Sequence, residues 1–297
     1  PRFSPTTAVR FNRSVAIADT MSFLDGRVEL TVGGRWQGIE AKTVSPTTGL
    51  TTSSTDNTAF SPGVGIVVKP VEHLSLYANY IEGLTSTAPP INAVNLNQSF
   101  PATVSKQVEV GAKYDFGTVG VSIAAFEIKQ PSGFLDPATR VFALNGEQRN
   151  QGLELNVFGQ PVHGLRLLGG VSIIDGVLTK ASNSAFNGNV AVGVPPVQFN
   201  LYGEYDLPPG LAPGVTLTGR VIYTSSQFYD QANTQSISDW TTLDLGIRYT
   251  TKIERTPVTL RANVQNVTGA NYWATTGRGI LSPGAPRTYL LSASFDF

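Results

Sequence analysis

The chain has 297 residues, of which 41% are hydrophobic and only 14% charged, well below the roughly 25% charged residues of soluble domains. Its 21 basic and 21 acidic side chains cancel, which gives no basic excess for nucleic acid, and the absence of cysteine excludes disulfides, thiol catalysis and thiolate metal sites. No apolar run approaches the roughly 20 residues that a membrane-spanning helix needs.

Alternation of apolar and polar residues, which predicts β-strands, runs through most of the chain. In VELTVGGRWQ, QVEVGAKYDF and LDLGIRYT, apolar or aromatic residues recur at every second or nearly every second position. The last stretch, RTYLLSASFDF, alternates in the same way and ends on an aromatic residue, Phe297. In chain order the pattern predicts thirteen strands, over residues 12–24, 27–40, 59–70, 73–82, 103–115, 118–131, 148–160, 164–178, 197–207, 214–226, 238–250, 257–266 and 286–297.

The connections between these strands alternate between short and long. The long ones are rich in Ser, Thr, Asn, Gly and Pro and cover residues 41–58, 83–102, 132–147, 179–196, 227–237 and 267–285. A β-sandwich or a propeller has strands of about 5–6 residues and no reason to keep its long loops at one end. Longer strands with long loops at one end predict an all-β, antiparallel transmembrane β-barrel, with about 13–14 strands in this chain.

The strand count raises a difficulty, because single-chain bacterial barrels have an even number of strands. Either the first residues, 1–11 with Phe3, Val9 and Phe11, add a fourteenth strand, or the chain is the C-terminal part of a larger barrel. Pro1 and Pro5 weaken the first interpretation, because proline disfavours strands. We expect the second.

A family resemblance is carried by SPGVGIVVKPVEHLSLYANYIEG, SKQVEVGAKYDFG, LRANVQNVTGANYW and GAPRTYLLSASFDF, in that order. These stretches resemble the TonB-dependent ferric-siderophore receptors, and the resemblance runs from about Ser14 to Phe297. It implies a 22-stranded barrel of the plugged-transporter kind, in the bacterial outer membrane. Residues 1–297 would then be one domain, the C-terminal part of the barrel, without the plug.

The resemblance also implies partners and a function. The expected function is uptake of ferric siderophore, driven through TonB by way of an N-terminal part that is missing from this chain. The surroundings would be outer-membrane lipid and lipopolysaccharide. Iron would enter only within the bound ferric siderophore, so no cofactor, protein-bound metal, nucleic acid or catalytic residue is expected.

Charged and imidazole side chains give little sign of catalysis. The two histidines, His73 and His163, fall beside short turns, far from the outer end where a haem ligand would lie. The charged residues of the polar strand faces mix both signs, so we expect a solvated wall with ion pairs, or contacts to a plug, rather than a selective pore. They are Glu29, Arg35, Glu109, Lys113, Glu154, Glu204, Arg220, Asp244, Arg248 and Arg261.

Aromatic residues near the long loops are the better candidates for a binding site. A ferric siderophore is bulky, partly apolar and hydrogen-bonding, and a concave aromatic site with a few polar groups suits it. Alternation points Trp240 and Phe228 inward, whereas Tyr80 belongs to the lipid-facing girdle. The alternative for any single ring is packing within its own loop. The candidate substrate-binding residues are Trp240, Phe228, Trp273, Arg278, Tyr229 and Phe134.

Two other functions remain open from the sequence. The first is a passive porin or small complete β-barrel channel, which would have no plug domain encoded upstream. The second is an outer-membrane lipase, which needs a Ser–His pair at the outer lipid-facing surface. His73 and His163 do not supply that pair, so we expect no enzyme.

The alternation of loop length predicts topology. Because the chain has no cysteine, cysteines placed at Thr51, Ser184 and Thr276 should react with an impermeant thiol reagent on intact cells, and one at Gly117 should not. Labelling of Gly117→Cys from outside would contradict the assignment.

Overall fold

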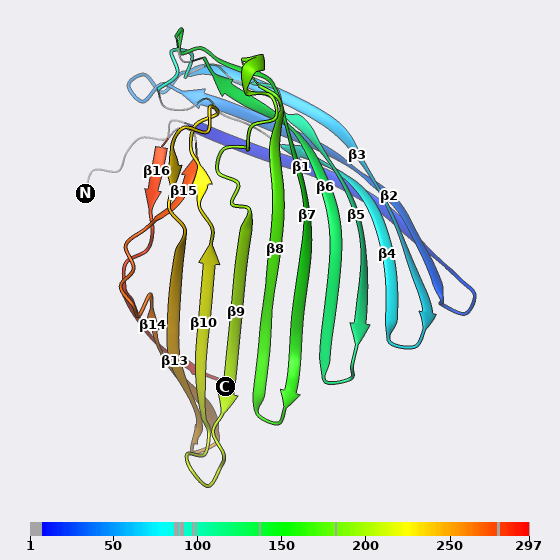
Figure 1. The fold of residues 1–297 in the computed structure, drawn as a ribbon, viewed down its shortest axis with the longest axis vertical. Helices are drawn as coiled ribbons and strands as arrows, with labels where there is room; N and C mark the ends of the chain where they lie inside the picture. The colour runs from blue at the N-terminus through cyan, green and yellow to red at the C-terminus, as the bar shows by residue number, and fades with distance from the viewer. Residues whose placement is uncertain are drawn as a thin grey trace. The chain divides into compact units, whose positions relative to one another are not determined.

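The computed structural model describes residues 8–85, 89, 92–96, 98, 100–136, 138–181, 183–277 and 280–296. Its main element is a 13-stranded antiparallel sheet in the order β1-β2-β3-β4-β5-β6-β7-β8-β9-β10-β13-β14-β17 (Figure 1). The strands are β1 (Ala8–Phe23), β2 (Val28–Val44), β3 (Thr51–Val71), β4 (Leu74–Thr85), β5 (Thr103–Asp115), β6 (Val119–Leu135), β7 (Phe142–Val162), β8 (Leu165–Lys180), β9 (Val197–Asp206), β10 (Val215–Thr224), β13 (Trp240–Ile253), β14 (Thr256–Gln265) and β17 (Thr288–Phe295).

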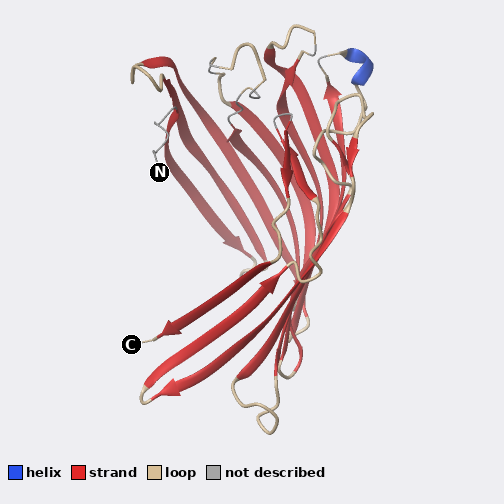
Figure 2. Ribbon diagram, turned by 90° about the vertical axis from the view of Figure 1, so that its left-hand side faces the viewer, coloured by secondary structure: helices blue, strands red, loops and turns tan. Residues whose placement is uncertain are grey.

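Short elements complete the described part of the chain. Two small hairpins pair β11 (Gln227–Phe228) with β12 (Ser236–Ile237) and β15 (Trp273–Gly277) with β16 (Ile280–Pro283). Figure 2 shows strand nearly throughout, with one helical turn at Ser184–Phe186. In the described residues, no helix is both long and apolar enough to cross a membrane.

The chain forms two compact units. The first contains Pro1–Gly111, Ala125–Gln151 and Asp175–Ala191, and the second contains Ala112–Ala124, Gly152–Ile174 and Val192–Phe297.

All thirteen predicted strands are confirmed, but three of them, β1, β3 and β7, begin at least four residues earlier than predicted. β3 begins at Thr51 and β7 at Phe142, so the predicted loops 41–58 and 132–147 shrink to 45–50 and 136–141. The added part of β3 is rich in Thr and Ser and pairs with β2, for example Thr55 with Ala41. Threonine is β-branched and suits a strand in water as well as in lipid, which is why a polar composition does not mark a loop here.

The alternative interpretation, a fourteenth strand from residues 1–11, is not supported by the part of those residues that the structure describes. Residues 8–11 continue β1 and pair with β2, from Ala8 opposite Thr43 to Phe11 opposite Glu40. Phe3 lies outside the described residues. At the other end of the sheet, Leu291 of β17 pairs with Ala262 of β14.

Apolar side chains of the strands are exposed at many positions. On β13, Leu245, Ile247 and Tyr249 are 47%, 43% and 41% exposed, whereas Thr242 on the other face is 5% exposed. On β17, Leu291 is 84% exposed. A water-soluble sheet buries such a face, and an outer-membrane strand turns it to lipid. Phe297, which prompted this expectation, lies outside the described residues.

Aromatic rings lie against glycines of neighbouring strands at several places. A Cβ atom added to Gly34 would collide with the ring of Phe60, and one added to Gly146 would collide with the ring of Phe134. The ring covers backbone that the glycine leaves bare, which restores the packing that a strand glycine loses. The same arrangement joins Gly111 with Tyr77, Gly120 with Phe158 and Gly133 with Phe142.

This packing makes a stability prediction. Gly146→Ala should lower the free energy of unfolding by about 1–3 kcal/mol, because the new methyl group collides with the Phe134 ring in a filled space. Gly63→Ala is the matched control, since its Cβ would lie 3.8 Å from the nearest atom, on Ile81. Urea unfolding in lipid vesicles measures both, and equal midpoints for the two variants would contradict the packing argument.

Candidate functional site

The β11–β12 hairpin extends the end of the β10–β13 ladder in the second unit. Thr224 pairs with Trp240 at the end of the ladder, and Gln227 then pairs with Ile237 in the hairpin. The backbone carbonyl of Phe228 accepts a hydrogen bond from Gly193 N at 2.9 Å, which ties the hairpin to the preceding loop. Gln227 and Phe228 are therefore held by pairing within the hairpin, and Phe228 is also held by the preceding loop.

The turn of this hairpin is closed by Asp230. Its carboxylate accepts hydrogen bonds from the backbone N of Gln235 at 2.7 Å and from the backbone N of Thr234 at 3.0 Å. Burial acts to raise the pKa of Asp230, but these hydrogen bonds to the charged form outweigh burial, and the pKa lies below its ordinary value. The turn is therefore fixed by an ionised carboxylate at neutral pH.

Trp240 and Tyr272 form a stacked aromatic pair. Their ring centroids are 4.3 Å apart and their planes differ by 27°. The Tyr272 ring also lies against Gly284, where an added Cβ atom would collide with it, and Tyr272 O accepts a hydrogen bond from Gly284 N at 2.8 Å. The pair thus joins the first residue of β13 to the loop between β14 and β17.

Asn266 fixes the base of that loop. It is 3% exposed and has a positive φ of 50°. Its side-chain Nδ2 donates to Ala270 O at 2.8 Å and to Ala285 O at 3.1 Å, and its Oδ1 accepts from Ala270 N at 2.8 Å. Its own N–H donates to Asp244 Oδ1 at 2.8 Å. One side chain therefore connects both arms of the loop, while its backbone N–H connects to β13.

Two polar atoms of this ladder and its hairpin are buried and have no hydrogen-bond partner in the described structure: Trp240 Nε1 and Gln227 Oε1. Gln227 is only 4% exposed. A buried polar group without a partner is costly, so such groups in a native structure call for an explanation. An N–H donor, a carbonyl acceptor and an aromatic surface are the groups that bind a ligand with both apolar and oxygen-bearing parts. We call Gln227, Phe228, Trp240 and Tyr272 the outer aromatic site.

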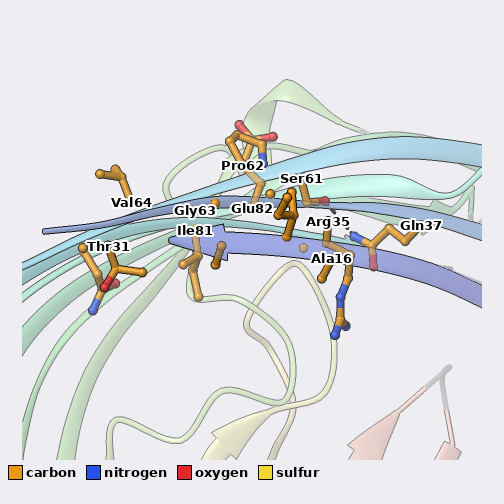
Figure 3. Close-up of a pocket in the computed structure, with 17 residues that line it drawn as sticks. Ala16, Thr31, Arg35, Gln37, Ser61, Pro62, Gly63, Val64, Ile81 and Glu82 are labelled. Carbon is orange, nitrogen blue, oxygen red and sulfur yellow. Dashed lines mark hydrogen bonds between the residues drawn. The ribbon is translucent and has the colours of Figure 1, made fainter. Parts of the chain in front are cut away.

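A hollow of about 610 Å³ lies in the first unit, along β1 to β4 (Figure 3). Small residues such as Ala16 and Gly63 form part of its lining, and Arg35 and Glu82 lie at it. Gln37 Nε2 donates to Ser61 Oγ at 2.7 Å on its wall. The hollow is open, whereas small-molecule sites enclose most of their ligand.

An ion-pair network lies in the second unit, close to the tight turns. Arg166 contacts Glu204 at 2.9 Å and Asp206 at 2.6 Å, and Arg248 contacts Glu204 at 2.9 Å. Thr216 Oγ1 donates to Asp206 at 2.6 Å. Two arginines and two carboxylates balance each other here, which confirms the expected ion pairing on the polar wall for Glu204 and Arg248.

The family assignment rests on a sequence-family model described as "TonB dependent receptor-like, beta-barrel", which matches residues 2–267. The chain belongs to this family. Receptors of the family are bacterial outer-membrane proteins, so the exposed apolar strand faces lie in the outer membrane.

Individual TonB-dependent receptors resemble the chain over nearly all of its length. The "Ferrichrome receptor FcuA" of Yersinia enterocolitica is 43% identical over 302 residues, covering 98% of this chain and 39% of the relative. A crystal structure of BauA, described as the ferric preacinetobactin receptor of Acinetobacter baumannii, is 40% identical with a TM-score of 0.77, covering 98% of this chain and 43% of that one. The siderophore receptor PiuA of Acinetobacter baumannii, 21% identical with a TM-score of 0.73, shares the fold. The chain spans about two fifths of the length of the first two relatives.

The structure of this TonB-dependent receptor chain brings some of the predicted site residues together. Trp240 and Phe228 lie on the same ladder and its hairpin, and Tyr229 N donates to Gln235 O at 3.1 Å in that hairpin. Trp273 is 48% exposed in β15. Arg278 lies outside the described residues.

Phe134 belongs to the first unit and is only 3% exposed against Gly146. Sequence reasoning did not select Tyr272, Gln227 or Asn266 as functional. Tyr272 is an aromatic residue of a long loop and stands directly before Trp273, so the sequence contained a signal for it. No feature of the local sequence indicates that Gln227 is buried.

The two histidines lie where the sequence predicts them. His73, with a φ of 68°, and His163 both lie in tight turns between strands.

The role of Asn266 can be tested directly. Asn266→Ala should make the loop between β14 and β17 more sensitive to protease on intact cells, because both arms lose their shared side-chain partner. Asn271→Ala, an exposed change in the same loop, is the control. Identical cleavage rates for the two variants would contradict the role given to Asn266.

Proposed function

We propose that the chain is the C-terminal barrel part of a receptor that takes up ferric siderophores across the outer membrane, powered through TonB. The observation that carries this proposal is 43% and 40% identity, along 98% of the chain, to proteins named as a ferrichrome receptor and a ferric preacinetobactin receptor. The plug and the segment that contacts TonB would belong to a part of the receptor outside this chain. Outer-membrane lipid and lipopolysaccharide would surround the barrel.

In this proposal the outer aromatic site contacts the siderophore, with Tyr229, Trp273 and Arg278 as further candidates. The stacked rings of Trp240 and Tyr272 offer an apolar surface for the organic part of the ligand. Trp240 Nε1–H would donate to a ligand oxygen, and Gln227 Oε1 would accept from a ligand N–H or O–H. Phe134 was a candidate as well, and its burial against Gly146 favours a packing role for it.

The ferric ion is cargo here and stays within its siderophore. The receptor then needs no ligand set of its own for iron, and recognition falls on the organic ligand. The two relatives are named for different ligands, ferrichrome and preacinetobactin, so the experiment must use a panel of siderophores.

The test is uptake of radioactive iron by cells whose only siderophore receptor is the full receptor. A panel of ferric siderophores should contain at least one that is taken up, and deletion of TonB should abolish that uptake. Absence of uptake across the panel, or uptake that persists without TonB, would refute the proposal.

Variants of Trp240 test the site itself. Trp240→Ala should weaken siderophore binding about tenfold or more, because an aromatic contact is lost. Trp240→Phe should fall between it and the unmodified receptor, because the phenyl ring keeps part of the aromatic contact but lacks Nε1–H. Trp36→Ala, on the lipid-facing side at 60% exposure, is the control. Titration of the purified receptor with the ferric siderophore measures all three, and unchanged affinity in Trp240→Ala would remove Trp240 from the site.

A further inference from the structure

A hollow of about 350 Å³ lies on the polar face of the second unit, along β8, β9, β10, β13 and β14. Part of its lining forms one row of side chains across these strands. The register places Leu168 opposite Tyr202, and Tyr202 opposite Arg220. It then places Arg220 opposite Asp244, and Gln265 of β14 lines the hollow beside them. We call Leu168, Tyr202, Arg220, Asp244 and Gln265 the inner row.

The two charged residues of the inner row are opposite each other, yet no ion pair joins them in the described structure. Arg220 Nε donates to Asn200 Oδ1 at 3.0 Å, and Asp244 Oδ1 accepts from the backbone N of Asn266 at 2.8 Å. Each charge is therefore held by a neighbour of its own. The remaining guanidinium N–H groups of Arg220 and the second carboxylate oxygen of Asp244 are left for the hollow.

Charges closer to the tight turns behave differently. Arg166 and Glu204 are also directly opposite in the register, and their charged atoms are 2.9 Å apart. Antiparallel pairing therefore allows an ion pair between opposite residues on this face. The separation of Arg220 from Asp244 is a feature of their own position, where a hydrogen bond from a backbone N–H holds the carboxylate.

The other end of the inner row supplies apolar surface. Leu168 is 59% exposed, on the face of β8 that otherwise carries polar residues such as Arg166 and Ser172. The hydroxyl of Tyr202 donates to Glu204 Oε1 at 2.6 Å, so the ring is the part of Tyr202 that a ligand can contact. Apolar surface beside a few polar groups in a concave wall suits a ligand with apolar and oxygen-bearing parts.

The inner row lies on the same face of β13 as the outer aromatic site. Trp240 and Asp244 are four residues apart, so they share a face and are separated by about 14 Å along the strand. Asp244 also accepts a hydrogen bond from Asn266, at the base of the loop that carries Tyr272. A molecule that leaves Trp240 toward the tight turns along this face therefore reaches the inner row next.

Resting on the function proposed above, we propose that the inner row is a second binding position for the ferric siderophore on its way through the receptor. Arg220 donates to an acceptor oxygen of the siderophore, Asp244 accepts from one of its N–H or O–H groups, and Leu168 contacts its apolar part. Passage requires binding that is strong enough for entry and weak enough for exit, which several successive positions provide. The ligand is thus a ferric complex whose organic part exposes both acceptor oxygens and hydrogen-bond donors.

The first test records whether the cargo passes the inner row. Photoreactive benzoylphenylalanine replaces Leu168 in the full receptor, and in a control receptor it replaces Leu245 on the lipid-facing side of β13. Cells are given the ferric siderophore that the uptake panel identifies, with tritium in its organic part, and are irradiated during uptake. We expect label on the Leu168 variant in cells with TonB, none in cells without TonB, and none on the Leu245 variant.

The outcomes separate this inference from the proposed function. Normal uptake without label at Leu168 would overturn the inference alone, and it is the result expected if the inner row only contacts another part of the receptor. Equal label with and without TonB would also overturn it, because the inner row would then belong to the first binding site. Absence of uptake across the whole panel would refute the proposed function and this inference with it.

The second test separates transport from binding. Arg220→Gln should lower the maximal uptake rate about tenfold, because a hydrogen bond from a charged group to the cargo is lost, and should leave the affinity of the outer aromatic site unchanged. Arg220→Lys keeps the positive charge and should recover part of the rate. Arg261→Gln, which removes an exposed cation from the same face of β14 outside the hollow, is the matched control. Equal rates in Arg220→Gln and Arg261→Gln, or a loss of affinity without a loss of rate, would contradict the proposal.

Discussion

Pairing of backbone hydrogen-bonding groups is the constraint on which the rest of this structure depends. In hydrocarbon an unpaired N–H or C=O costs several kcal/mol, so a chain that crosses with strands must pair each strand along its whole length. The antiparallel registers meet this need, as in β1 and β2, which pair from Ala8–Thr43 to Phe23–Val28 without a shift. Once pairing is continuous, the side chains can only alternate between two faces, and each face takes the chemistry of its surroundings.

The strand pattern was predictable because the alternation of apolar and polar residues can be read within each segment alone. Membrane strands expose one face to lipid. Leu245, Ile247 and Tyr249 are therefore apolar because they face lipid, whichever residues lie beside them. The upper part of β3 was not predictable in this way. Above the membrane both faces meet water, the alternation stops, and only pairing with β2 reveals that Thr51–Ala59 is strand.

The site was harder to predict than the strands, because it depends on contacts between distant segments. Alternation selected Trp240 as a candidate near a long loop, but its stacking partner Tyr272 lies 32 residues further along the chain, and neither local sequence shows the stacking. Gln227 has a polar side chain, which predicts exposure, but the tertiary structure buries it. The ion pair of Arg166 with Asp206 was also not predictable. It depends on the register between neighbouring strands, which is known only once the strands are paired.

The two-residue period also dictates where such a protein can change in length. Losing one residue inside Val197–Asp206 would carry Glu204 from its arginines to the lipid side and bring an apolar neighbour onto the polar wall. The paired interior of the sheet therefore tolerates substitution but not insertion or deletion. Connections such as 45–50 and 136–141 can change in length without moving any strand residue to the other face of the sheet. Divergence in ligand recognition thus has two separate routes: exchange of side chains at fixed strand positions, and free growth or shortening of the loops above them.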